Sequence, residues 1–274
     1  MTTTVYSSYR SDDILCNHHR LDVSGDYSSH SHDAYEFVFL KTGNIAYMIE
    51  GKVYHPTRNC LVLVRPGEIH SMKFLDHTTY ERYDLIFDEK NLETDICRRI
   101  PRHVSMIHFD DNQTVIDLFE KTDRYIDTFD EEALNTLLHH LIEEILFHVL
   151  LSSGDQDPED TYTVNPVIQQ AVRYINKNIT QPLSIDMICS TLYITKSHLH
   201  HLFMKYLKIT PKKYILSKKL TLAQKKLHAG ESATDVAFAC GFTDYSTFYR
   251  DYKGYFGYAP SMEPEKKVVH KTYI

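Results

Sequence analysis

A group of side chains that can hold a metal ion or a polar ligand falls near residue 30. His30 and His32 stand two residues apart, so in an extended strand both side chains point to the same face, and Glu36 keeps that parity. Together with a returning His70 they could surround one metal ion, because imidazole nitrogens and carboxylate oxygens are common metal ligands. The same side chains could instead form hydrogen bonds to a polar ligand without a metal.

A second polar pair lies in the stretch 80–87, whose alternation of residue types predicts a β-strand. One face of this strand would carry Arg82, Asp84 and Ile86, and the other would carry Tyr83, Leu85 and Phe87. If the first face is internal, the charged pair would form a hydrogen-bonding site suited to a sugar. If that face is external, the pair is a solvated surface feature, and the sequence does not decide between the two.

The most extensive pattern lies between residues 183 and 260, which hold one motif twice. Ser184, Ile188, Cys189 and Tyr193 return 48 residues later as Ser232, Val236, Ala237 and Gly241, and Ser197, Leu199, Phe203 and Pro211 return 49 residues later as Ser246, Phe248, Tyr252 and Pro260. Each copy begins with a serine that can cap a helix, and each predicts a short helix, a turn and a second helix. A helix–turn–helix of this kind fits the major groove of DNA.

In the second helix of each copy, an apolar face lies opposite a face rich in hydrogen-bond donors. Leu199, Leu202 and Phe203 recur at helical spacing and predict a buried face. The opposite faces form the predicted DNA-binding surface, with Lys196, Ser197, His200 and His201 in the first copy and Tyr245, Ser246, Tyr249, Arg250 and Lys253 in the second. We expect Arg250 to read a base and Lys253 to hold a phosphate, because a guanidinium forms paired hydrogen bonds with guanine.

A predicted helix over residues 211–228 joins the two copies. Thr210 caps it, Pro211 opens it and Gly230 ends it. A helix of that length spans about 27 Å at about 1.5 Å per residue. Major grooves on one face of DNA repeat about every 34 Å. Both copies could therefore read one face of the same duplex.

The N-terminal part of the chain predicts short strands followed by two long helices. Apolar runs divided by Gly, Pro and Asn predict strands at 35–41, 45–50, 53–55, 60–64, 71–75 and 80–87, a pattern typical of a sandwich or small barrel. Helices are predicted at 112–126 and 131–151. The second helix has apolar residues on more than one face, among them Leu138 and Ile145, so we expect it to cover the barrel and to meet the same helix of a second copy.

Residues 152–164 are polar, lack periodicity and predict a flexible linker. The linker separates regions of opposite charge. Residues 1–162 hold 14 Lys and Arg against 30 Asp and Glu, a net charge of −16, and residues 163–274 hold 16 against 7, a net charge of +9. A basic C-terminal domain indicates a nucleic-acid partner. The basic tail after Pro264 is expected to be loose.

The five cysteines show no close pair, which indicates a reducing cytosol. The N-terminus has no basic and apolar signal segment, and no apolar run approaches the roughly 18 residues of a membrane span. We therefore expect a cytoplasmic protein without a membrane partner.

The repeat region resembles the AraC/XylS transcription regulators. The resemblance covers about residues 165–260 and rests on Asp235-Val236-Ala237, Cys240-Gly241-Phe242, Ser246, Phe248, Arg250, Tyr252-Lys253, Phe256-Gly257 and Ala259-Pro260. The first copy departs from the family pattern, with Cys189 in place of alanine and with Tyr193 and Lys208 in place of glycine. These departures leave the shape of the first turn open.

The segments around His30 and His70 resemble the two motifs of cupin barrels, namely His30-Ser31-His32 with Glu36 and Gly43, and Pro66-Gly67-Glu68-Ile69-His70. Arg65 stands where metal-binding cupins often have proline, and a cation at the mouth suits an anionic or hydroxyl-rich ligand. The resemblance to regulators with a cupin-like sensor domain implies a pocket without a metal, so we expect no cofactor. The predicted effector-binding residues are His32, Glu36, Arg65, His70, Arg82 and Asp84, and the metal alternative keeps His30, His32, Glu36 and His70.

The expected fold is a multidomain α and β protein. It has a cupin-like β-barrel with following helices over 1–108 and 109–151, the second range serving dimerisation. After the linker 152–164 comes an all-α domain over 165–262 with two helix–turn–helix motifs, for which the resemblance implies seven helices.

The expected function is sequence-specific regulation of transcription, without enzymatic activity. The family resemblance implies an activator more often than a repressor. The hydrogen-bonding groups expected to converge in the barrel suit a small polar effector, a carbohydrate or a related metabolite. The resemblance implies double-stranded DNA, the effector, a second copy of the chain and RNA polymerase as partners. The alternative is a metal-dependent cupin enzyme whose C-terminal domain tethers it to a partner. Bound metal with turnover would support that alternative, but the sequence shows no nucleophile–base arrangement.

Overall fold

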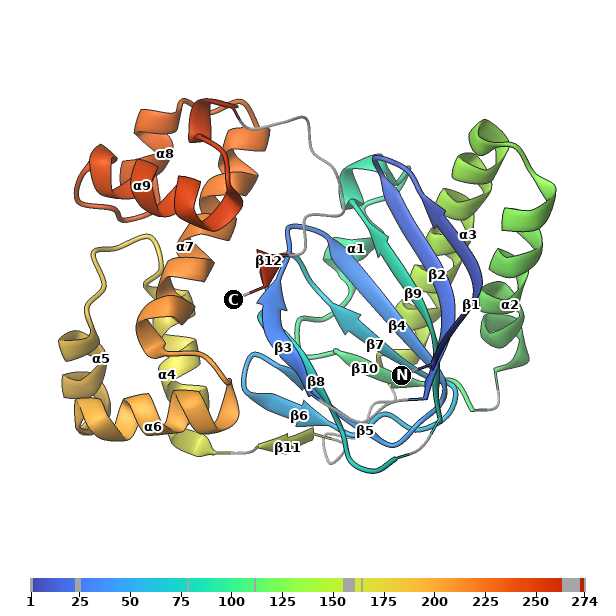
Figure 1. Ribbon diagram of the computed structural model, residues 1–274, viewed down its shortest axis with the longest axis horizontal. Coiled ribbons are helices and arrows are strands. Elements are labelled where there is room, and N and C mark those ends of the chain that lie inside the picture. Colours follow the sequence, from blue (N-terminus) through green and yellow to red (C-terminus); the bar gives the residue numbers. More distant parts are fainter. Residues whose placement is uncertain are drawn as a thin grey trace.

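The computed structural model describes residues 2–22, 26–77, 79–110, 112–154, 161–163, 165–262 and 272–273. These residues form a β-rich domain, two long helices on one side of it and an all-helical domain on the other side (Figure 1). The multidomain α and β class that the sequence predicts is therefore confirmed.

The β-rich domain, called the barrel domain below, consists of two antiparallel sheets, each with six strands among the described residues. The first sheet has the order β1 (Thr2–Arg10), β2 (Ile14–Asp22), β9 (Thr79–Phe87), β4 (Tyr35–Thr42), β7 (Cys60–Val64) and β10 (Met106–His108). The second has the order β11 (Thr161–Thr163), β6 (Lys52–Tyr54), β5 (Ile45–Ile49), β8 (His70–Phe74), β3 (Asp26–Ser31) and β12 (Thr272–Tyr273). The two sheets pack together in a cupin-like arrangement that does not close into a full barrel.

The inner strands β4, β7 and β9 of the first sheet are mostly buried on both faces, and their alternating side chains enter two different cores. On β4, Phe37 and Phe39 pack toward helices α2 (Gln113–Thr128) and α3 (Glu131–Ser152), whereas Val38 and Leu40 pack toward the second sheet. Between β9 and β10 the chain forms a 3₁₀ turn, η1 (Glu89–Asn91), and the short helix α1 (Ile96–Arg99). Because Phe37 and Phe39 face one way and Val38 and Leu40 face the other, the interior between the two sheets is separate from the core under the helices.

The six predicted strands match β4 to β9 with ends that differ by at most one residue. The predicted helices 112–126 and 131–151 match α2 and α3, and their ends differ by at most two residues. Strands β1, β2, β3 and β10 were not predicted. β1 is an exposed edge strand rich in Thr and Ser, so it lacks the apolar alternation that marks a half-buried strand.

The helical domain contains two lobes joined by one long helix, α7 (Pro211–His228). The first lobe has α4 (Pro166–Lys177), α5 (Ile185–Leu192) and α6 (Lys196–Tyr206), and the second has α8 (Ala233–Ala239), α9 (Tyr245–Phe256) and the 3₁₀ turn η3 (Pro260–Met262). Each lobe has its own apolar core. The two helix–turn–helix motifs are confirmed. The described part of the domain has six α-helices and a 3₁₀ turn where the resemblance implies seven helices.

The turns inside the two motifs have the same backbone shape despite different residues. Gly241 has a φ of +72°, and Tyr193 at the matching position has a φ of +54°. A β-carbon crowds the backbone in this left-handed region, so glycine suits it and tyrosine is strained there. The Tyr193 side chain is 95% exposed. Tyr193, which replaces the glycine of the family pattern, therefore adopts the same turn, and its backbone is strained.

Two segments expected to be loose contribute strands. In the predicted linker, Ser152 ends α3 and Thr161–Thr163 form β11 on the edge of β6, while residues 155–160 and 164 lie outside the described residues. In the predicted loose tail, Thr272–Tyr273 form β12 beside β3. The expectation does not hold at these positions, because the edges of β6 and β3 offer backbone hydrogen-bonding groups to a neighbouring segment.

Candidate effector and DNA-binding sites

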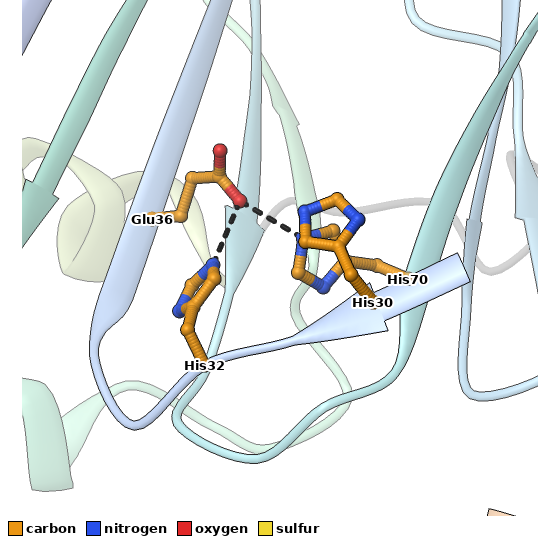
Figure 2. A group of neighbouring side chains, drawn as sticks. All are labelled: His30, His32, Glu36 and His70. Atoms are coloured by element: carbon orange, nitrogen blue, oxygen red, sulfur yellow. Dashed lines mark hydrogen bonds and ion pairs between the residues drawn. The ribbon is translucent and has the colours of Figure 1, made fainter. Parts of the chain in front are cut away.

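The four side chains predicted as one group meet between the two sheets (Figure 2). His30 and His70 are partners across β3 and β8, His32 follows β3, and Glu36 reaches them from β4 of the other sheet. One ligand atom of each residue lies within 4.8 Å of those of the other three. All four residues are buried, with at most 7% of each exposed. They are called the tetrad below.

Backbone carbonyls orient two of the three imidazoles. Nδ1 of His32 lies 3.0 Å from the carbonyl oxygen of Ala34, and Nδ1 of His70 lies 2.9 Å from that of Glu68. A carbonyl only accepts hydrogen bonds, so both Nδ1 atoms carry the hydrogen and donate it. Nε2 of each ring then faces Oε2 of Glu36, at 3.1 Å from His32 and 3.0 Å from His70.

Arg82 and Asp84 line the same interior. The apolar residues that alternate with them on β9 pack under α2 and α3, so the charged pair faces the second sheet. Arg82 and Asp84 form an ion pair, with Nε of Arg82 3.0 Å from Oδ1 of Asp84. Arg82 also donates hydrogen bonds, from Nε to Nε2 of His19 and from Nη1 to the hydroxyl of Tyr80 at 2.9 Å. Of the two alternatives that the sequence leaves open, the internal one is correct.

Tyr47 also belongs to this interior, although nothing in the sequence distinguishes it from an ordinary strand aromatic. Its ring is parallel to that of His70, with centroids 6.1 Å apart and planes at 8°. Burial, and next the charge of Glu36, raise the pKa of Tyr47 well above its usual value. The hydroxyl therefore stays protonated at neutral pH and can act as a donor.

Arg65 does not join the tetrad. Its guanidinium donates from Nη2 to the carbonyl oxygens of Pro101 and Val104, at 2.9 Å and 2.8 Å. These bonds fasten the loop before β10 to the end of β7. The prediction of a cation at the mouth of the site is therefore corrected, because backbone carbonyls of a segment distant in the sequence take its donors.

The predicted DNA-binding side chains lie on the outer faces of α6 and α9. Those that are exposed are Lys196, Ser197, His200, His201, Ser246, Tyr249, Arg250 and Lys253, and Tyr245 is half-buried. Beneath them Leu199, Phe203, Phe248 and Tyr252 are buried. The predicted division into buried and exposed faces is confirmed, and contact of the exposed faces with DNA stays a prediction.

The cations on these faces are only weakly engaged. Nε of Arg250 lies 3.5 Å from Oδ1 of Asp251, and the Arg250 side chain is 74% exposed. Nζ of Lys196 lies 2.6 Å from Oδ1 of Asp186, and both side chains are largely exposed. Exposed ion pairs contribute about 0–1 kcal/mol. Both cations can therefore exchange these partners for a base or a phosphate.

A largely buried carboxylate, Glu50, connects the barrel domain to the helical domain. One oxygen lies 2.8 Å from Nζ of Lys218, and the other accepts hydrogen bonds from Tyr214 at 2.6 Å and Asn176 at 2.8 Å. Burial acts to raise the pKa of Glu50, but the charge of Lys218 and the hydrogen bonds from these partners outweigh it and lower the pKa below 4.5. Glu50 is therefore ionised at neutral pH and holds α7 by a charged contact.

Two further segments of the barrel domain touch the helical domain. Ser29 on β3 donates to the carbonyl oxygen of Leu207 at 2.5 Å. In the loop before His70, the carbonyl oxygen of Gly67 accepts from Lys218 at 2.7 Å, and Ile69 is buried in the core of the first lobe. Each contact joins residues far apart in the chain, so the sequence held no local pattern that predicted the interface.

Helix α3 packs its apolar face against the barrel domain. It is long and apolar enough to cross a membrane by length and composition alone. Leu138 and Ile145 are fully buried in the core that α3 shares with the first sheet. The prediction that these two residues meet a second copy is therefore wrong. On the opposite side, Phe147 and Leu151 are exposed.

A barrel domain with buried polar groups, joined to two helix–turn–helix motifs, defines the class of effector-responsive DNA-binding regulators. Residues 22–142 match the family model of AraC-like ligand-binding domains, and residues 188–262 match a helix-turn-helix domain model. The chain belongs to the AraC/XylS family of transcription regulators.

Several transcription regulators are similar to this chain over most of their length. The chain is 25% identical over 219 residues to the uncharacterized HTH-type transcriptional regulator YidL of Escherichia coli K12, covering 78% of this chain and 69% of that protein. It is 24% identical over 224 residues to the lactose operon transcription activator of Staphylococcus xylosus, covering 78% and 77%. Among solved structures, wild-type ToxT of Vibrio cholerae with a bound unsaturated fatty acid is 14% identical with a TM-score of 0.41, covering 94% of this chain and 97% of that one.

Proposed function

We propose that the chain activates transcription when a small polar effector, of carbohydrate type, binds in the barrel domain. The observation that carries this proposal is the interface at Glu50. It attaches the domain that holds the buried polar groups to α7, the helix that joins the two helix–turn–helix motifs. A change in the barrel domain can therefore alter how the two motifs are held.

The DNA contacts follow from the geometry of α6 and α9. α7 is 18 residues long, about 27 Å at about 1.5 Å per residue, and it places one motif at each end. In this proposal Arg250 reads a base edge, and Lys196 and Lys253 hold phosphates. The net charge of +9 over residues 163–274 attracts the duplex, and the acidic N-terminal region stays away from it.

The effector contacts come from the interior between the two sheets. His32, Glu36 and His70 lie at one place in it, and Arg82 and Asp84 add a charged pair. Imidazole, carboxylate and guanidinium groups suit the hydroxyls of a sugar because they combine donors with acceptors. The name of the Staphylococcus xylosus relative, a lactose operon activator, supports the same effector class.

Coupling requires that the effector bind one arrangement of the domains more tightly than another. The tetrad residues lie next to interface residues in the sequence: Ser29 precedes His30, and Ile69 precedes His70. A ligand that moves these histidines therefore moves the contacts to the helical domain. The proposed regulator acts in the cytoplasm, as a homodimer, together with RNA polymerase.

The proposal is tested with the full chain and DNA from upstream of its own and neighbouring genes. Electrophoretic mobility should show a specific complex, and one member of a panel of sugars and sugar acids should change its Kd by at least about fivefold. Glu50→Gln should keep DNA binding but reduce that response, and Glu132→Gln, on the exposed start of α3, should leave both unchanged. Binding of every fragment with equal affinity, or a response unaltered by Glu50→Gln, would contradict the proposal.

A further inference from the structure

The orientation of two histidines in the tetrad creates an electrostatic problem. The hydrogen on Nδ1 of His32 and His70 is donated to a backbone carbonyl, so a neutral ring presents the lone pair of Nε2. That lone pair points at Oε2 of Glu36 from 3.1 Å and 3.0 Å. Carboxylate oxygens also carry only lone pairs when ionised. Two acceptors thus converge on a third in a buried site, and a cation bound among them would satisfy all three.

The three imidazole rings lie close together around the carboxylate of Glu36. The rings of His32 and His70 have centroids 5.1 Å apart, and the ring of His30 lies 4.1 Å from that of His70. A single divalent cation shared by all four side chains removes the clash of lone pairs.

We propose that His30, His32, Glu36 and His70 bind one divalent first-row transition-metal ion. The four ligand atoms lie within 4.8 Å of one another, close enough to surround one ion (Figure 2). Nitrogen from three imidazoles favours zinc, iron, nickel or cobalt over magnesium and calcium, which prefer oxygen ligands. Backbone acceptors at Nδ1, as His32 and His70 have, are the usual outer contacts of metal-binding histidines.

Four protein ligands need not fill the coordination shell of such an ion, because five- and six-coordinate sites are common for several of these metals. An added ligand would supply oxygen, as a hydroxyl or carboxylate group does. This part of the inference rests on the proposed function, because it makes the ion the place where the effector attaches.

The ligands of the ion lie on the segments that hold the helical domain. Along β3, Ser29 and Ser31 alternate with His30, and they contact Leu207 and Ser217 of the helical domain. The strand thus presents the tetrad on one face and the interface on the other. Loading the ion should therefore change the affinity of the full chain for DNA.

The test uses the untagged full chain after treatment with a chelator. Calorimetric titration with Zn²⁺ should show one tight site per chain, and His30→Ala and Glu36→Gln should each weaken it more than about 100-fold, beyond the 10–100-fold typical of outer contacts. The matched control is His140→Ala. Glu93, His140 and Glu143 form the other group in the described residues that could hold an ion, and Glu93 and His140 are exposed. Circular dichroism checks that each variant is folded.

A second measurement does not depend on loss of binding. His30→Cys loaded with Co²⁺ should gain a sulfur-to-cobalt charge-transfer band, because a thiolate at residue 30 would contact the ion directly. Absence of tight Zn²⁺ binding in the wild type, or binding lost in His140→Ala and kept in Glu36→Gln, would overturn the proposal. Both readouts are made without DNA, so a failure of the proposed metal site can be distinguished from a failure of the proposed regulatory function.

Discussion

Arg250 combines a chemical type and an exposed position that suit recognition of a base. Its side chain is 74% exposed on the outer face of α9 and has only a weak contact with Asp251. We predict that Arg250→Ala lowers specific DNA affinity by about 1–3 kcal/mol while non-specific affinity changes little. Fluorescence anisotropy at fixed salt, with specific and scrambled duplexes, measures the ratio. Lys253→Ala is the matched control and should weaken both duplexes alike.

Glu50 and Lys218 form a largely buried charged contact, so removing one partner should cost more than removing both. Lys218→Met leaves the Glu50 carboxylate buried with less compensation and should destabilise the chain by about 3–5 kcal/mol. Adding Glu50→Gln to Lys218→Met should recover part of that loss, which chemical denaturation of the two variants would show. Equal stability of the single and double variants would show that the unpaired Glu50 carboxylate carries no penalty, contrary to this prediction.

The pKa of Glu50 also fixes how the contact depends on pH. Because the pKa is lowered in the folded chain, the ionised group stabilises the fold above the unfolded value near 4.5, and this stabilisation is lost as pH falls through the folded value. We expect the difference in Tm between wild type and Glu50→Gln to be constant from about pH 6 to 8 and to shrink below about pH 4.5. Melting curves across this range measure it, and a difference that grows in acid would contradict the assignment.

At the scale of elements, the chain makes one turn twice with different residues, which supplies an internal comparison. Tyr193 and Gly241 both have positive φ, and only glycine adopts it without strain. Tyr193→Gly should be neutral or stabilise the fold by up to about 1 kcal/mol, since relief of strain competes with the greater entropy of glycine in the unfolded chain. Denaturant titration of the full chain measures it.

Gly241→Ala should have the opposite effect. A β-carbon there would lie 2.6 Å from the carbonyl oxygen of Gln181, in addition to the strain of its φ. A loss of about 1–3 kcal/mol is expected. If both substitutions changed stability in the same direction, the two turns would not share one conformation in solution.

At the scale of the whole molecule, the two faces of α3 have separate roles. Leu138 and Ile145 are buried in the core under the first sheet, and Phe147 and Leu151 are exposed on the other side. We predict that the double variant Phe147→Glu, Leu151→Glu gives folded monomers in sedimentation experiments. Leu138→Glu should unfold the domain instead, because it buries an unpaired charge in a packed core. A dimeric double variant would place the proposed homodimer contact elsewhere.

Local patterns in the sequence determined most elements and the division of α6 and α9 into buried and exposed faces. Periodicity and caps are short-range properties, so Thr210, Pro211 and Gly230 were sufficient to predict both ends of α7 correctly. The two-residue spacing of His30 and His32 correctly predicted that both side chains point into one site, although β3 ends at Ser31 and His32 follows it. The weakly patterned strand β1 was missed, because an exposed edge strand needs no apolar alternation.

Only the tertiary structure decided which groups meet across the chain. In the folded chain, Glu36 of the first sheet lies beside three histidines on or next to strands of the second sheet, and Arg82 and Asp84 face the interior. Arg65 donates to two backbone carbonyls instead. The fold also buries Leu138 within one copy. The physical reason is that packing and buried hydrogen bonds depend on the positions of all neighbouring elements, whereas the sequence by itself determines the faces that each element can offer.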